Sequence, residues 1–187
     1  DPSTRDLGVL IVMNDVILAA SEATKTHTES VDTFQCPDFG PLGIVDKDRV
    51  MITRRPTHRT HIEASGTLPD VALVKMAAGM DGRMIRAAAS TGAAGLVIEA
   101  LGRGNVPPET IPAIREVLTA GLPVVIASRC LRGRVLDTYG YPGGGYELRE
   151  LGCLFAGSLP GQKARIRLML ALAAVGRHRV AEYFEGL

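Results

Sequence analysis

The sequence has few aromatic residues: Trp is absent, and Phe, Trp and Tyr together make up 4% of the 187 residues. A base-stacking surface for single-stranded nucleic acid is therefore not expected. An excess of one charge is also lacking, because 21 basic and 20 acidic side chains leave a formal net charge of +1. Nucleic-acid-binding domains usually carry a clear basic excess. Both absences argue against nucleic acid as a partner.

Long apolar runs and paired cysteines are lacking too. The longest apolar stretches, such as residues 168–175, are far shorter than the roughly 20 residues of a membrane-spanning helix, so no membrane partner is expected. The three cysteines, Cys36, Cys130 and Cys153, cannot all pair and form no Cys-x-x-Cys motif. Reduced thiols and the plain composition favour the cytoplasm. Hydrophobic residues make up 46% of the chain, which excludes a disordered protein.

Residues 7–13 form an apolar run that ends at Asn14-Asp15. A continuous apolar, β-branched run of this kind predicts a strand buried on both faces of a parallel sheet. Such a strand needs neighbours, and we expect none from residues 1–30. The sequence also lacks an initiator Met, so residues 1–30 are predicted to be the end of a larger α/β domain cut from a longer chain.

Residues 31–69 are rich in proline, with Pro37, Pro41, Pro56 and Pro69. They predict a linker with one hairpin, whose turn is Asp46-Lys-Asp48.

Strand and helix patterns alternate from residue 70 onward. Strands are expected over residues 71–76, 95–99, 122–127 and 153–156, and helices over 81–91, 107–120, 162–175 and 178–184. This alternation indicates a parallel sheet with right-handed crossovers. The predicted fold class is α/β: a small, Rossmann-like C-terminal domain over residues 70–187, preceded by the last strand and the linker of a larger α/β domain.

The segment Ala23-Thr-Lys-Thr-His-Thr28 is the most informative local feature. Three hydroxyls and one amine crowd into six residues soon after a predicted strand, where α/β sheets place their ligands. A lysine held there can act as a base or proton shuttle. By composition alone, a solvated polar loop is the commoner occurrence. His27 either lines such a site or is solvated.

The flanks of this segment carry a family resemblance. In order, the chain reads Gly8-Val-Leu-Ile-Val-Met-Asn-Asp15, Ala23-Thr-Lys-Thr-His-Thr28, Thr33-Phe34 and Phe39-Gly-Pro-Leu-Gly43. This series closely resembles the bacterial L-asparaginase family, the threonine-dependent amidohydrolases that convert asparagine to aspartate and ammonia.

Later segments extend the resemblance over nearly the whole chain. Gly92-Ala-Ala-Gly-Leu-Val97 is similar to the family's Gly-x-Asp-Gly-Ile-Val strand, with Ala94 at the aspartate position. Gly102-Arg-Gly-Asn-Val106 resembles the glycine-rich turn that follows it. Ala156-Gly-Ser-Leu-Pro-Gly-Gln-Lys-Ala-Arg165 resembles the family's helix entrance Gly-x-Leu-x-Pro-Gln-Lys-Ala-Arg.

The resemblance implies two α/β domains, assembly as a homo-oligomer, L-asparagine as substrate with L-glutamine left open, and no cofactor. Lys25 matches the family lysine that tunes and relays protons at a catalytic threonine, and Thr24 beside it is assigned to substrate binding. The family's Thr-Gly-Gly-Thr and Gly-Thr-Asp-Thr segments, which hold the nucleophile and a second threonine, do not occur in this sequence. The chain thus resembles the C-terminal portion of an asparaginase, and we expect it to be inactive alone.

Asp81 lies where the family's small domain lends side chains to the site of a neighbouring subunit. It is predicted either to contact substrate or to cap the helix that follows, and capping is the commoner role. A family glutamate is not clearly matched near Gly143-Gly-Gly-Tyr-Glu147, where a contact comes from backbone or from Glu147. This departure leaves the preference between asparagine and glutamine open.

Other motifs favour less specific roles. His58 and His61 have a metal-compatible spacing, but they lie in an Arg-rich segment and are expected at the surface, so no metal site is predicted. Gly102-Arg-Gly104 lacks the third glycine of a dinucleotide fingerprint. The alternative function is a non-catalytic remnant or interaction domain of asparaginase fold. A component of a tRNA-dependent amidotransferase is a third option, which the net charge disfavours.

Overall fold

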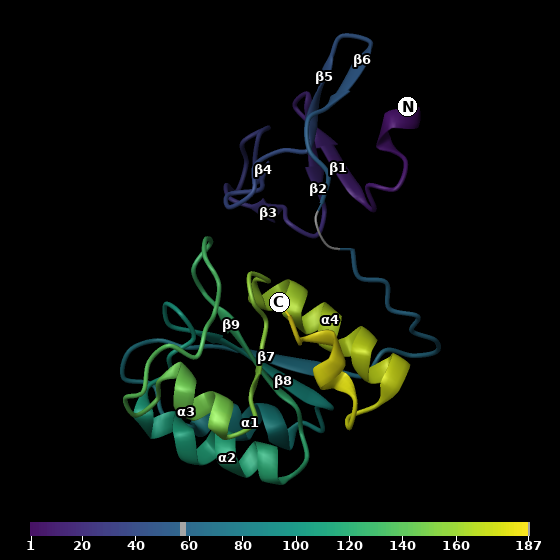
Figure 1. Cartoon of the computed structure of the whole chain (residues 1–187). Coiled ribbons are helices and arrows are strands. Elements are labelled where there is room, and N and C mark those ends of the chain that lie inside the picture. The colour runs from purple at the N-terminus through teal and green to yellow at the C-terminus, as the bar shows by residue number, and fades with distance from the viewer. Residues whose placement is uncertain (57–58, 187) are drawn as a thin grey trace. The chain divides into compact units, whose positions relative to one another are not determined.

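The computed structural model describes residues 1–56 and 59–186 (Figure 1). The chain forms two compact units, Asp1–His61 and Ile62–Leu187.

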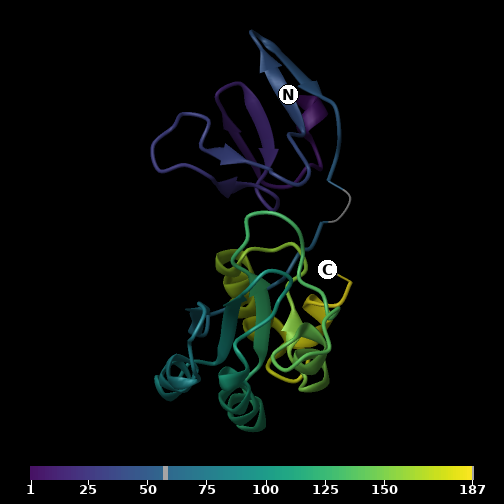
Figure 2. The same cartoon turned by 90° about the vertical axis from the view of Figure 1, so that its left-hand side faces the viewer.

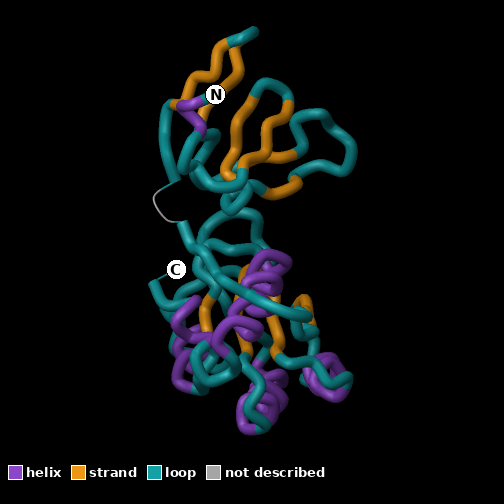
Figure 3. The backbone as a smooth tube through the Cα atoms, turned by 90° about the vertical axis from the view of Figure 1, so that its right-hand side faces the viewer, coloured by secondary structure: helices purple, strands orange, loops and turns teal. Residues whose placement is uncertain are grey.

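The N-terminal unit is built from short antiparallel strands (Figure 3). A four-stranded sheet has the order β1-β2-β5-β6, with β1 at Leu10–Met13, β2 at Val16–Ala19, β5 at Gly43–Asp46 and β6 at Arg49–Ile52. A separate pair joins β3 (Thr24–Lys25) to β4 (Phe34–Gln35), and a short 3-10 turn, η1, covers Pro2–Thr4. The core of the larger sheet contains Leu7, Ile17, Ala19 and Leu42.

The expectation of a lone parallel strand over residues 7–13 is wrong. β1 pairs antiparallel with β2, and its four residues are exposed or only partly buried. The reason lies in Asn14 and Asp15, whose φ angles are 49° and 59°. Two consecutive residues with positive φ form the tight turn that closes a β-hairpin. Residues 1–30 therefore do supply a neighbour for the first strand.

Residues 31–56, expected as part of a linker, belong to the N-terminal unit. β5 and β6 form the hairpin that the sequence predicts, and the pair Asp46 and Arg49 flanks its turn. Lys47 occupies the turn with a φ of 55°. The short apolar segments between the prolines can form strands because Val45, Val50 and Ile52 pack against the core of the sheet.

The C-terminal unit has a parallel sheet of order β10-β9-β8-β7. The strands are β7 (Val71–Lys75), β8 (Gly95–Ala100), β9 (Val124–Ser128) and β10 (Leu154–Phe155), and the helices are α1 (Arg83–Ser90), α2 (Ile111–Thr119), α3 (Gly145–Glu150) and α4 (Gly161–Val175). Helices α1 and α2 lie on one face and α4 on the other (Figures 1 and 2). The parallel α/β unit that the alternation predicts is confirmed.

Both faces of this sheet are apolar because helices cover both. On β8, Leu96 and Ile98 face α1 and α2, whereas Val97 faces Leu168 of α4. The six residues of β8 are all buried.

Three details of this unit differ from the expectation. Residues 178–184 do not form an α-helix; a 3-10 turn, η3, covers Val180–Tyr183. Helix α3 was not expected, because the glycine run before it hides the helical pattern. The helix expected over residues 107–120 begins with a 3-10 turn, η2 (Pro108–Thr110), and continues as α2.

Candidate functional site

Lys25 and Thr24 form strand β3 of the small hairpin. Thr24 pairs with Gln35 and Lys25 pairs with Phe34 on β4. Thr24 is partly buried, whereas Lys25 is exposed. The Lys25 Nζ lies 5.6 Å from the centroid of the Phe34 ring, within the range of a cation–π interaction. Because successive side chains of a strand point to opposite faces, the hairpin presents the Lys25 amine on the face of Phe34 and the Thr24 side chain on the other face.

The loop that joins β3 to β4 is closed by its own polar groups. The Thr26 amide and hydroxyl both donate to the Thr33 carbonyl, at 2.8 and 3.0 Å. The Thr33 hydroxyl accepts from the His27 amide at 3.2 Å and donates to the His27 carbonyl. The His27 Nδ1 accepts from the amides of Glu29 and Ser30, at 3.1 and 3.0 Å. Two of the candidate site groups, Thr26 and His27, thus hold the loop in shape.

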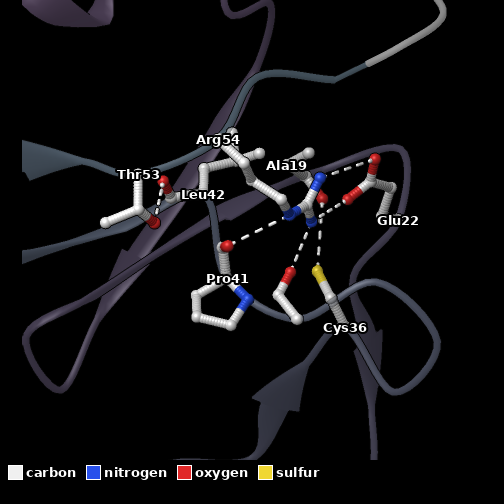
Figure 4. Close-up of polar contacts among 8 residues, drawn as sticks. Ala19, Glu22, Cys36, Pro41, Leu42, Thr53 and Arg54 are labelled. Carbon is white, nitrogen blue, oxygen red and sulfur yellow. Dashed lines mark hydrogen bonds and ion pairs between the residues drawn. The ribbon is translucent and has the colours of Figure 1, made fainter.

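The base of the hairpin contains an ion pair that sequence reasoning missed (Figure 4). Arg54 Nη2 lies 2.5 Å from Glu22 Oε2, and Nη1 donates to Glu22 Oε1 at 3.4 Å. Arg54 also donates from Nη2 to the Gly40 carbonyl and from Nε to the Pro41 carbonyl, the latter at 3.1 Å. The side chains of Arg54 and Glu22 are 28% and 15% exposed. No local signal pairs two residues 32 positions apart.

Asp81 lies in the connection from β7 to α1. Its Oδ1 accepts from the Arg83 amide at 3.0 Å, and its Oδ2 lies 2.9 Å from Arg83 Nε. The hydrogen bond from the Arg83 amide, reinforced by the Arg83 side chain, lowers the pKa of Asp81 below its ordinary value. Helix α1 begins at Arg83, and its N-cap is Gly82, which makes no side-chain capping hydrogen bond. Asp81 lies one residue before the N-cap and accepts from the first amide of the helix, and this contact gives its side chain a structural role.

A buried carboxylate lies near the end of β8, an inner strand of the parallel sheet. Glu99, next to last on β8, is 7% exposed, and its Oε2 lies 2.9 Å from Nζ of Lys75, its register partner on β7. The first residue of α4 is Gly161, where an added Cβ would lie 2.3 Å from Glu99 Cγ. The glycine makes room for the carboxylate. In the sequence, this site is marked only by an acidic residue, Glu99, near the end of an apolar strand.

The glycine run before α3 is required by packing. A Cβ on Gly143 would lie 2.2 Å from the Val106 carbonyl oxygen, and a Cβ on Gly144 would lie 2.3 Å from the Tyr139 carbonyl oxygen. Glu147 Oε2 accepts from the Gly143 amide at 2.8 Å. The carboxylate of Glu147 therefore holds this turn.

Metal-binding clusters and membrane spans are absent from the part of the chain that the structure describes. Residues 1–56 and 59–186 contain no group of three or more His, Cys, Asp or Glu side chains able to hold a metal ion. His58 lies outside the described residues, and His61 is exposed. No helix in the described ranges is long and apolar enough to span a membrane.

The two units define an α/β protein in which a threonine and a lysine are consecutive residues of a short hairpin strand. The C-terminal domain of glutaminase/asparaginase matches residues 70–184, and the N-terminal domain of asparaginase matches residues 1–58. The chain therefore belongs to the glutaminase/asparaginase family, and the resemblance seen in the sequence is confirmed.

Named relatives agree with this membership. An L-asparaginase of Bacillus licheniformis is 34% identical over 173 residues, which cover 92% of this chain and 54% of the relative. A probable L-asparaginase of Deinococcus radiodurans is 38% identical over 182 residues, 95% of this chain and 55% of the relative. A component of the glutamyl-tRNA(Gln) amidotransferase of Halobacterium salinarum is 37% identical over 164 residues, 80% of this chain and 37% of the relative.

A solved structure is similar as well. The crystal structure of a probable cytoplasmic L-asparaginase from Campylobacter jejuni superposes with a TM-score of 0.88 at 30% identity. The match covers 98% of this chain and 59% of that chain. The chain spans about half the length of the asparaginase relatives it matches.

Proposed function

We propose that the chain is the Lys25-bearing part of an L-asparaginase-type amidohydrolase, which converts asparagine and water to aspartate and ammonia. The observation that carries the proposal is the hairpin that displays Thr24 and Lys25, in a chain of the glutaminase/asparaginase family. The names of the relatives support asparagine as substrate, and glutamine is the alternative. We further propose that the protein assembles as a homo-oligomer and lies in the cytoplasm.

The reaction breaks the C–N bond of the side-chain amide and forms a C–O bond in its place. A threonine hydroxyl adds to the amide carbon, the amide nitrogen gains a proton and leaves as ammonia, and water then breaks the ester bond of the intermediate to release the acid. In our proposal Lys25 tunes and relays the proton at the attacking threonine, while Thr24 contacts the substrate. Asp81 contacts the amino group of a substrate in a neighbouring subunit in addition to capping α1.

The attacking threonine is proposed to lie in a segment that this chain does not contain, since neither Thr-Gly-Gly-Thr nor Gly-Thr-Asp-Thr occurs in the sequence. The chain is therefore proposed to be inactive alone and active only with an N-terminal asparaginase domain that supplies the attacking threonine, because residues 1–58 match only a part of that domain without this segment. A non-catalytic interaction domain is the alternative.

The test measures ammonia release from asparagine by the purified chain mixed with a separately made N-terminal asparaginase domain. Lys25→Met is expected to lower kcat about 10²- to 10⁴-fold, the usual contribution of a proton-transfer group. Lys47→Met is the matched control, because Lys47 lies in the exposed β5–β6 turn, and its activity should equal that of the unchanged chain. Equal activities of the two variants would contradict the role given to Lys25.

The similarity to the amidotransferase component favours one second candidate, a protein that acts on tRNA-bound substrate. The net charge of +1 argues against a tRNA-binding surface. Retarded migration of tRNA in the presence of the chain at 150 mM salt, roughly physiological ionic strength, would support this candidate over free asparagine.

A further inference from the structure

The β3–β4 hairpin is too small to fix its own direction. Each strand has two residues, Thr24–Lys25 and Phe34–Gln35, and an isolated two-stranded hairpin is at best marginally stable in water. Lys25 and most of the connecting loop are exposed. The place of the Lys25 amine therefore depends on contacts at the base of the hairpin as well as on the Phe34 ring.

One guanidinium group joins the two ends of that base (Figure 4). Glu22 lies where the chain enters the hairpin, and its carboxylate accepts from both terminal nitrogens of Arg54. Gly40 and Pro41 lie where the chain leaves it, and their carbonyl oxygens accept from the same guanidinium. A planar group with five N–H donors in fixed directions can serve all of these acceptors at once, which a lysine cannot.

Arg54 is itself anchored to the main sheet of the N-terminal unit. Its backbone amide donates to the carbonyl of Leu42 at 3.1 Å, and the Thr53 amide donates to the same oxygen at 2.8 Å. The Leu42 amide in turn donates to the Ile17 carbonyl on β2 at 2.8 Å. Leu42 and Ile17 are 0% and 1% exposed. The contacts therefore run from a buried core, through Arg54, to the hairpin.

Residues 19–23, where the chain enters the hairpin, are held by their own hydrogen bonds, so the position of Glu22 determines that of Lys25. The Glu22 and Ala23 amides both donate to the Ala19 carbonyl, at 3.0 and 2.9 Å, which makes residues 19–23 a closed turn. Ala23 is 3% exposed and packs with Leu18 and Cys36. Lys25 follows two residues later, so a shift of Glu22 displaces the amine.

We propose that Arg54 is a positioning residue for Lys25, acting through Glu22 and the carbonyls of Gly40 and Pro41. This inference rests on the proton-transfer role proposed above for Lys25. Displacements of about 1 Å at a reacting group can cost about 10²-fold in rate, so loss of this anchor is expected to lower kcat with little change in KM.

The activity test compares four variants of the full chain mixed with the N-terminal asparaginase domain. Arg54→Met should lower kcat about 10- to 100-fold, within the range that misplacement of a reacting group produces. Arg54→Lys should lower kcat less than Arg54→Met does, because lysine keeps the positive charge but lacks the planar guanidinium with its fixed donors. Glu22→Gln should behave like Arg54→Lys. The control Arg55→Met should keep full activity, because Arg55 contacts only the carbonyls of Ser3 and Arg5 among the contacts described.

A double-mutant cycle separates positioning from general stability. In a Lys25→Met background, adding Arg54→Met should leave kcat unchanged, because the effect of Arg54 acts through the Lys25 amine. A merely structural role would lower the rate by the same factor in both backgrounds, and that result would overturn the inference. If Arg54→Met fails to fold, Glu22→Gln takes its place in the cycle.

A second readout needs no activity. Amide hydrogen exchange of residues 24–35 should be faster in Arg54→Met than in Arg55→Met, while exchange in β8 and β9 stays the same. If the mixture with the unchanged chain releases no ammonia, the proposed function fails. Amide hydrogen exchange of residues 24–35 then still tests whether Arg54 holds the hairpin. Equal protection of residues 24–35 in the two variants would overturn the inference whether or not the mixture is active.

Discussion

Lys25 and Phe34 face each other across the β3–β4 pair, and the Lys25 Nζ lies 5.6 Å from the centroid of the Phe34 ring. Phe34 is partly buried and packs beside Leu18, Ala23 and Cys36. The ring therefore connects the exposed amine to the small apolar cluster under the hairpin. The attraction between the ammonium and the ring restrains the amine without withdrawing it from solvent.

Phe34→Leu should lower kcat of the mixture modestly. A cation–π contact at an exposed site contributes about 0.5–1 kcal/mol, which corresponds to roughly 2- to 5-fold in rate. Phe34→Tyr keeps an aromatic face and should retain nearly full activity. Initial rates of ammonia release measure both. A loss of the same size in the two variants would contradict a cation–π contribution of the ring.

Gly161→Ala should destabilise the C-terminal unit. The added Cβ would lie 2.3 Å from Glu99 Cγ, and overpacking of this kind costs about 1–3 kcal/mol. Gly140→Ala is the matched control, since a Cβ there has no neighbour within 4 Å. Urea unfolding compares the two variants with the unchanged chain. Equal midpoints for the two variants would contradict the packing of Glu99 against the start of α4.

Asp81→Ser separates the two roles proposed for Asp81. Serine still accepts from the Arg83 amide as a helix cap, but it removes the negative charge. If Asp81 contacts the amino group of the substrate, Asp81→Ser should raise KM for asparagine while the unfolding midpoint stays close to that of the unchanged chain. Asp81→Ala should lower the midpoint as well. An unchanged KM in Asp81→Ser would leave capping as the whole role of this residue.

The Asp81–Arg83 contact also predicts a pH dependence. Because Arg83 lowers the pKa of Asp81 from its ordinary value of 3.8 in the folded chain, the stabilising contribution is present above pH 3.8 and is lost as the pH falls through the lower, folded value. The difference in unfolding midpoint between the unchanged chain and Asp81→Ala should therefore shrink below pH 3.8. A difference that grows on acidification would contradict this sign.

The Cys153 thiol should resist alkylation in the folded chain. Burial raises its pKa from 9.0 to about 12, so the reactive thiolate does not form at neutral pH. Cys130 is exposed and Cys36 is buried. Iodoacetamide at pH 8 should therefore label Cys130 alone in the folded chain and all three thiols in urea, as mass spectrometry can show. Labelling of Cys153 without urea would contradict its burial.

The raised pKa of Cys153 also predicts a pH dependence of stability. The protonated thiol contributes its stability below pH 9, and this contribution is lost as the pH rises toward 12.

The C-terminal unit could be predicted from the sequence because its signals are local. β8 is an apolar run, broken only by Glu99, between glycine-bearing turns, and α4 is a long helical segment. The first strand differs from the expectation for a local reason as well: Asn14 and Asp15 predict the end of a strand, but both residues adopt the positive φ of a hairpin turn.

The contacts that shape the candidate site could not be predicted in the same way. Lys25 and Thr24 were found through their setting in the sequence, which marks the hairpin but not what holds it. Arg54 reaches Glu22 across 32 positions, and folding of the intervening strands brings them together. Pairings of this kind leave no periodicity in a single sequence. His27 shows the same limit, since its hydrogen bonds to the Glu29 and Ser30 amides depend on the loop conformation.

The most direct test of the proposed function is ammonia release from asparagine by the 187-residue chain, alone and mixed with a separately made N-terminal asparaginase domain. We expect no release by the chain alone, release by the mixture, and loss of that release in Lys25→Met. Release by the chain alone would place a nucleophile within these residues and contradict the proposal. Silence of a folded mixture would show instead a domain that keeps the asparaginase fold without its chemistry.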